Sequence, residues 1–186
     1  MGREFSEWGK LETSQRYTGT EHEIDLLDTM RVNDQKFKNK FIELGGDAKT
    51  GYLSYNKALR LVRECQPGDP TDPKKDFSRD LRVAIIDDLK IEPGQENAVK
   101  IYTALRSPLD KFHGVDAVVE IEEGKKIRRA TLDVSLNTKK GEGYKADVVA
   151  LGEIPDPTEG GQAEELYLKR VEEIAEEIVK VLKKAA

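Results

Sequence analysis

The chain has 186 residues, of which 37% are hydrophobic and 36% are charged, and its formal net charge is −5. This length suits one domain, and the apolar residues gather in periodic runs that a disordered chain would lack. A net negative charge argues against a module that coats nucleic acid with a broad basic surface, although it allows a few local phosphate contacts. The single cysteine, Cys65, excludes an intrachain disulfide and a cysteine-rich zinc site.

The sequence shows neither a secretory leader nor an apolar run long enough to span a bilayer. We therefore expect a cytoplasmic protein without a membrane partner. The oligomeric state stays open at this point, a homodimer included.

The first part of the chain has the pattern of helices. Residues 1–20 show no clear period, whereas apolar residues recur at helical spacing in residues 21–44 and again in residues 54–65. A stretch with three prolines in seven residues follows, and it marks a loop. We expect residues 1–75 to form a helical N-terminal extension that ends in a proline-rich linker.

The second part of the chain predicts strands between helices. Residues 76–89 fit a helix or a buried strand, with the helix favoured, and residues 95–106 have an apolar spacing that favours a helix. Residues 163–184 form the clearest amphipathic helix. Three β-branched segments lie between them and are expected to be strands: 114–121, 127–137 and 145–153. The expected fold is therefore α/β (α+β), with an αβββα core in residues 76–186 whose mixed sheet is flanked by helices.

The stretch ATLDVSLNTKK, residues 130–140, has two unlike faces if it is a strand. Alternate side chains point to opposite sides of a sheet, so one face is apolar and the other carries a row of small polar groups. Asp133 lies in this row, in mid-strand, where an aspartate is disfavoured. Asp116 lies on the preceding strand, and because neighbouring strands are about 4.8 Å apart, the two carboxylates can share one divalent cation. The alternative is that both acids face solvent on a one-sided sheet.

The order helix, Asp-bearing strand, strand with a second Asp, strand, helix resembles the PD-(D/E)xK nuclease-like superfamily. The resemblance rests on SPLDKFHGVDAVVEI, TLDVSLNTKK and YKADVVALGE, and it covers about residues 95–184. It implies that Asp116 and Asp133 bind Mg²⁺ or Mn²⁺, with the peptide carbonyl of Val134 as a further ligand. It also implies an enzyme that hydrolyses the phosphodiester bonds of nucleic acid.

The chain departs from this superfamily at one position. The superfamily has a lysine two residues after the second acid, where this chain has Ser135. Lys139 has the parity to face the same side, and Lys145 begins the next strand, so either is a candidate to stabilise charge on the phosphate. If neither does so, the chain is a catalytically inactive nuclease-like scaffold that binds nucleic acid or a protein partner. The sequence leaves both functions open.

Several polar residues around the two acids are candidate accessory groups. Each also has a structural explanation, as an acid in the first turn of a helix, a turn residue, or a residue at a strand end. The accessory candidates are Glu96, Asp110, His113 and Ser135.

Basic residues at both ends of strand 127–137 are candidates to contact the phosphates of nucleic acid. The alternative is ordinary hairpin charge that protects a sheet edge from pairing with other chains. The candidates for nucleic-acid binding are Lys125, Lys126, Arg128, Arg129 and Lys140.

Overall fold

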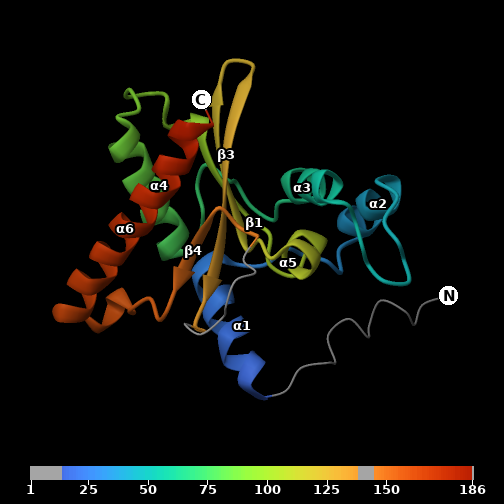
Figure 1. Cartoon of the computed structure of the whole chain (residues 1–186), viewed down its shortest axis with the longest axis horizontal. Helices are drawn as coiled ribbons and strands as arrows, with labels where there is room; N and C mark the ends of the chain where they lie inside the picture. Colours follow the sequence, from blue (N-terminus) through green and yellow to red (C-terminus); the bar gives the residue numbers. More distant parts are fainter. Residues whose placement is uncertain (1–13, 138–144, 186) are drawn as a thin grey trace.

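The computed structural model describes residues 14–137 and 145–185. Its centre is a four-stranded sheet with helices on both faces (Figure 1). The strands lie in chain order, β1 to β3 are antiparallel, and β4 is parallel to β3. The mixed sheet and its flanking helices confirm the predicted α+β class. The strands are β1 (Val99–Thr103), β2 (Ala117–Glu123), β3 (Lys126–Ser135) and β4 (Val148–Leu151).

Two helices cover one face of the sheet, α4 (Asp76–Leu89) and α6 (Gln162–Lys184) (Figure 1). Both were predicted from their apolar spacing, and both are confirmed to within a residue. A short 3₁₀ turn, η2 (Pro157–Glu159), precedes α6. We call the packing on this face the first core. Its buried side chains include Leu81, Ile85, Val119, Leu132 and Ile178.

Three helices cover the opposite face, α2 (Gln35–Glu43), α3 (Tyr55–Glu64) and α5 (Pro108–His113) (Figure 1). Their side chains pack against the sheet in what we call the second core. The predicted helix 54–65 is confirmed as α3. Helices α2 and α3 of the N-terminal part therefore share the second core with the sheet, whereas Leu26 and Leu27 of α1 (Ser14–Leu27) belong to the first core. Members of the second core are Phe41, Leu61, Tyr102, Leu109 and Val118.

The predicted helix over residues 95–106 is wrong. A 3₁₀ turn, η1 (Glu96–Ala98), occupies its start, and the edge strand β1 follows. Val99 and Ile101 point into the first core, whereas Tyr102 points into the second. A strand that is buried on both faces gives an apolar run without strict alternation, and such a run is hard to distinguish from a helix by its pattern.

The predicted helix over residues 21–44 is two helices, α1 (Ser14–Leu27) and α2, and α1 begins within the segment expected to be irregular. The chain turns at Asp28, whose φ is +63°. It is held there by two contacts with the end of β1: Thr103 Oγ1 donates to the Asp28 carbonyl at 2.9 Å, and the Met30 N–H donates to the Leu105 carbonyl at 3.1 Å. Tertiary contacts therefore interrupt a helical pattern that reads as continuous.

The short helix α5 was not predicted. Ser107 caps it, because its Oγ accepts the Leu109 N–H at 3.1 Å, and Pro108 occupies the first helical position, where its missing N–H costs nothing. Across the described ranges, every helix is too short or too polar to cross a membrane.

Candidate functional site

Asp116 and Asp133 lie next to each other at one end of the β2–β3 hairpin. Ala117 pairs with Leu132, so the residues one step further along the two strands are Asp116 and Asp133. The Asp116 N–H donates to the Leu132 carbonyl at 2.8 Å, and Asp116 Oδ2 accepts the Val134 N–H at 2.8 Å. These bonds flank Asp133, and by standard bond lengths they bring Asp116 Oδ2 within about 6 Å of the Asp133 Cα. The structure therefore brings the two predicted acids together.

Both acids are removed from water, since the exposed fraction is 4% for Asp116 and 9% for Asp133. Burial, together with the negative charges of Asp110, Glu23 and Asp133, raises the pKa of Asp116 to about 9, although the hydrogen bond from the Val134 N–H lowers it. Without a compensating cation, Asp116 is thus protonated at neutral pH.

Two further carboxylates come from helices around the pair. Asp110, in α5, was a predicted accessory residue, and its Oδ2 accepts the Arg106 N–H at 2.7 Å. Glu23, in α1, was not predicted, because nothing in its own segment distinguishes it from a surface acid of a helix. Both lie near enough to raise the pKa of Asp116. The site therefore draws on α1, α5, β3 and the residue that directly precedes β2.

The position of the superfamily lysine is occupied by a buried hydroxyl. Ser135 is 5% exposed, and its Oγ accepts the Asn137 N–H at 3.3 Å. Lys145 donates to the Phe112 carbonyl at 3.1 Å, so its ammonium is held at the end of α5. Lys139 and Lys140 lie outside the described residues. Val134 contacts Asp116 through its N–H, and the role of its carbonyl as a metal ligand stays a prediction.

Glu96 lies at the other end of the sheet. Val99 pairs with Ile121 and Thr103 with Ala117, so η1 precedes the end of β1 that is remote from Asp116. The five residues of β1 span about 14 Å at an extended rise. The Glu96 carboxylate accepts the Gly94 N–H at 2.9 Å. The structure therefore does not bring this predicted accessory acid to the pair.

The four predicted basic residues that the structure describes lie toward the hairpin turn, away from the acids. Lys125 and Lys126 are exposed there. Arg128 bonds Glu123 and the Leu182 carbonyl, and Arg129 pairs with the fully buried Glu120 at 2.6 Å. The two arginines thus neutralise acids of their own chain, whereas the two lysines remain on the surface.

His113 belongs to the packing between α5 and the loop before α3. Its Nε2 hydrogen-bonds the Leu53 carbonyl at 2.8 Å, and its ring lies 5.5 Å from the Tyr55 ring. These contacts fix the histidine among aromatic residues. None of them is a contact with Asp116 or Asp133.

The donor set fits an incomplete magnesium site. In residues 14–137 and 145–185, no three or more His, Cys, Asp or Glu side chains are grouped as a metal cage. Mg²⁺ is commonly bound through only one or two carboxylates, with water and substrate phosphates as the other ligands. Asp116 and Asp133 are hard oxygen donors of this kind, so the residues present fit Mg²⁺ or Mn²⁺ if substrate and water complete the shell.

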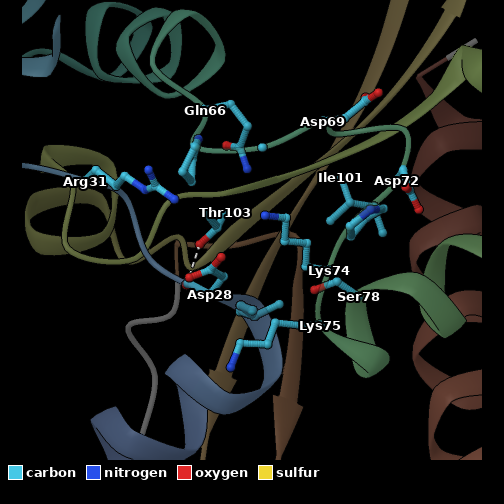
Figure 2. A pocket seen from close by; sticks show the side chains of 14 residues that line it. Asp28, Arg31, Gln66, Asp69, Asp72, Lys74, Lys75, Ser78, Ile101 and Thr103 are labelled. Carbon is cyan, nitrogen blue, oxygen red and sulfur yellow. Dashed lines mark hydrogen bonds between the residues drawn. The ribbon is translucent and has the colours of Figure 1, made fainter. Parts of the chain in front are cut away.

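A separate cleft lies along the outer edge of β1 (Figure 2). Basic and acidic side chains line it together, among them Arg31, Lys74, Asp69 and Asp72. Beside this cleft, the proline-rich segment hydrogen-bonds the outer edge of β1. The Pro70 carbonyl accepts the Ile101 N–H at 2.9 Å. The Gln66 side-chain amide accepts the Thr103 N–H at 3.2 Å and donates to the Thr103 carbonyl at 3.3 Å. Neither Asp116 nor Asp133 lines this cleft.

No protein-family model, curated protein or solved structure matches this chain. The resemblance to PD-(D/E)xK nucleases therefore stays a prediction, and the case for a function rests on the chemistry of the two acids.

Proposed function

We propose that the chain holds Mg²⁺ or Mn²⁺ with Asp116 and Asp133 and hydrolyses phosphodiester bonds of nucleic acid. The observation that supports this most is the position of Asp116, a buried carboxyl whose pKa is raised by burial and by the charges of three other carboxylates. Burying an acid against like charges costs free energy, and a bound cation would offset this cost. Perturbed acids of this kind gather at functional sites more often than elsewhere.

The two strands position the acids before any ligand arrives. The Val134 N–H holds Asp116 Oδ2 at 2.8 Å, and Oδ1 would bind the cation. Asp133 supplies the second carboxylate from the adjacent strand, and the β2–β3 ladder fixes both backbones. Bound Mg²⁺ would supply the acidification of a water molecule and the polarisation of a phosphate oxygen.

We assign the contact with the phosphate to Lys145. Its ammonium bonds the Phe112 carbonyl in α5, the helix that also carries Asp110. An ammonium group has three donors, so Lys145 can contact a phosphate while it keeps this bond. Positive charge at that point would stabilise the charge that develops on the phosphate.

A second function, a catalytically inactive scaffold, is favoured by Ser135. A hydroxyl carries no charge and cannot replace a lysine ammonium beside a phosphate. Ser135 is also buried and bonded to its own strand end. In this function the chain binds nucleic acid or a protein partner and leaves the phosphodiester bond intact.

Cleavage of labelled single-stranded and duplex oligonucleotides separates the two functions. We expect the wild type to cleave with Mg²⁺ or Mn²⁺ and to be inactive in EDTA. Asp116→Asn and Asp133→Asn should each lower the rate about a hundredfold or more, beyond the usual effect of an outer-shell partner. Glu96→Gln, at the far end of the sheet, is the matched control and should cleave as the wild type does.

Equal cleavage by the wild type and Asp133→Asn would assign the signal to a contaminating nuclease and reject the proposal. Metal-independent binding of oligonucleotides without cleavage, at any metal concentration, would instead support the inactive scaffold.

A further inference from the structure

Four aromatic rings meet on the side of the sheet that α3 and α5 cover, and we call them the aromatic platform: Tyr52, Tyr55, Phe112 and His113. The Tyr52 and Phe112 rings are 5.4 Å apart and nearly perpendicular, at 80°. Tyr55 and His113 form a second edge-to-face pair, at 5.5 Å and 88°. The bond from His113 Nε2 to the Leu53 carbonyl ties the helix and the loop together. The rings are therefore held in place before any partner binds.

Part of this platform faces water. Tyr52 is 47% exposed and Tyr55 is 39% exposed, and both stand beside partly buried rings. Tyrosine side chains that are clustered, fixed and half exposed provide contact area for a partner at little entropic cost. The geometry thus describes a surface that can stack against flat groups.

Two lysine ammonium groups lie beside these rings, although the whole chain is acidic. The segments that carry the rings and their contacts, residues 45–57, 106–113 and 145–147, contain five Lys or Arg against three Asp, in a chain of net charge −5. The Lys111 ammonium lies 5.2 Å from the centre of the Phe112 ring, and the Lys145 ammonium bonds the Phe112 carbonyl. The basic residues are Lys49, Lys57, Arg106, Lys111 and Lys145.

The platform borders the two acids. Helix α5 carries Asp110, whose negative charge adds to burial in raising the pKa of Asp116. Two residues later the same helix carries Phe112 of the platform. On β3, Thr131 lies on the same face as Asp133, and its hydroxyl donates to Asp147 at 2.7 Å. Burial, together with the negative charge of Asp147, raises the pKa of the Tyr55 phenol. A strand of nucleic acid that lies on the rings would therefore pass close to the carboxylates.

We infer that the aromatic platform binds single-stranded nucleic acid, with unpaired bases stacked on Tyr52 and Tyr55 and phosphates beside the lysines. Stacking needs bases that are not paired, so the platform selects single strands over duplex. A local excess of cations in an acidic chain favours a polyanion over an apolar protein partner. The role of this surface in delivering substrate rests on the proposed function, but binding itself needs no metal.

The test is fluorescence anisotropy of a labelled twelve-nucleotide oligothymidylate, in EDTA, with the full chain. We expect single-strand binding that falls steeply with salt and exceeds binding of a duplex of the same length. The double variant Tyr52→Ala/Tyr55→Ala should weaken it about tenfold or more, and Tyr52→Phe/Tyr55→Phe should retain it, because phenylalanine keeps the stacking ring. Ile127→Ala, 40% exposed on the distant hairpin, is the control and should bind as the wild type does.

Unchanged binding by the alanine variant at an unchanged melting temperature would overturn the inference, as would equal affinity for duplex. A dimer that the alanine variant dissolves, with no oligonucleotide binding by the wild type, would also overturn it and assign the surface to self-association. Single-strand binding without metal-dependent cleavage would uphold the inference and reject only the proposed hydrolysis. An alanine variant that retains both its single-strand binding and its metal-dependent cleavage in full would reject the inference and leave the proposed hydrolysis standing.

Discussion

Asp116 combines a predictable position with an environment that the sequence does not show. Period-two alternation places it and Asp133 on one face of neighbouring strands, and the register confirms that they are adjacent. Glu23 could not be predicted, because it reaches the site from a helix far away in the sequence. The contact of Lys145 with a backbone carbonyl is likewise a product of tertiary packing. Strand parity therefore predicts the pair of acids, and only the fold supplies their surroundings.

The raised pKa of Asp116 predicts a pH-dependent loss of stability when no divalent cation is present. The folded chain keeps the proton up to a pKa of about 9, whereas the unfolded carboxyl releases it near its ordinary value of 3.8. The folded state binds more protons between these values, so the free energy of unfolding falls as the pH rises through this window. Asp116→Asn keeps an uncharged acceptor for the Val134 N–H and avoids this loss.

We expect Asp116→Asn to be more stable than the wild type at pH 8 by about 1 kcal/mol or more, the equivalent of one pKa unit, and similar to it at pH 4. Urea unfolding in EDTA at the two pH values measures the difference. A wild type that gains stability relative to the variant from pH 4 to pH 8 would show that Asp116 is ionised in the fold.

Elements with a single apolar stripe are predicted well, and elements buried on two sides are not. The stripe of α6 is confirmed, since Tyr167, Ile174 and Ile178 are all buried. β1 was expected to be a helix. Its apolar residues pack into both cores, so they do not alternate strictly with polar residues. Its outer edge is closed by Gln66 and Pro70, which lie in a segment whose prolines indicated only a loop. The local sequence pattern identifies an element that buries one face. When an element buries both faces, apolar residues no longer alternate regularly with polar ones, and the element type is harder to predict.

The stripe of α6 predicts an unequal response to two similar truncations on the same helix. Ile178 is fully buried, at 0% exposed, and Leu168 is 48% exposed. Ile178→Ala should lower the free energy of unfolding by about 2–5 kcal/mol, because it leaves a cavity in the first core. Leu168→Ala should change it by no more than about 0.5 kcal/mol. Urea unfolding of both variants measures the two changes in the free energy of unfolding. Equal losses of this free energy would contradict the packing of α6.

At the scale of the whole molecule, one sheet joins two cores. The proline-rich loop suggests a division near residue 75, but the second core contains side chains from both sides of it, including Phe41, Leu61, Leu109 and Val118. The buried Glu120 adds a polar link, since it lies 3.0 Å from Arg63 of α3 and 2.6 Å from Arg129 of β3. Composition marks the loop, and it gives no sign of which sheet face the N-terminal helices cover.

This shared sheet predicts that residues 76–186 do not fold alone. Without α2 and α3, the fragment exposes Tyr102, Val115 and Val118 on one face of the sheet. We expect the full chain to unfold in one cooperative transition, and the fragment to lack both a cooperative transition and a near-ultraviolet circular dichroism signal. A fragment that unfolds cooperatively in urea would show that the N-terminal helices are an accessory layer.

The central claim is that Asp116 and Asp133 form one divalent-cation site, and Mn²⁺ binding to the full chain tests it most directly. Titration followed by electron paramagnetic resonance should give one bound ion per wild-type chain at neutral pH, with binding weakened about tenfold or more by Asp116→Asn and by Asp133→Asn. Glu96→Gln, an acid removed at the far end of the sheet, should bind as the wild type does. Equal Mn²⁺ binding by all four proteins, or none by the wild type, would contradict the claim.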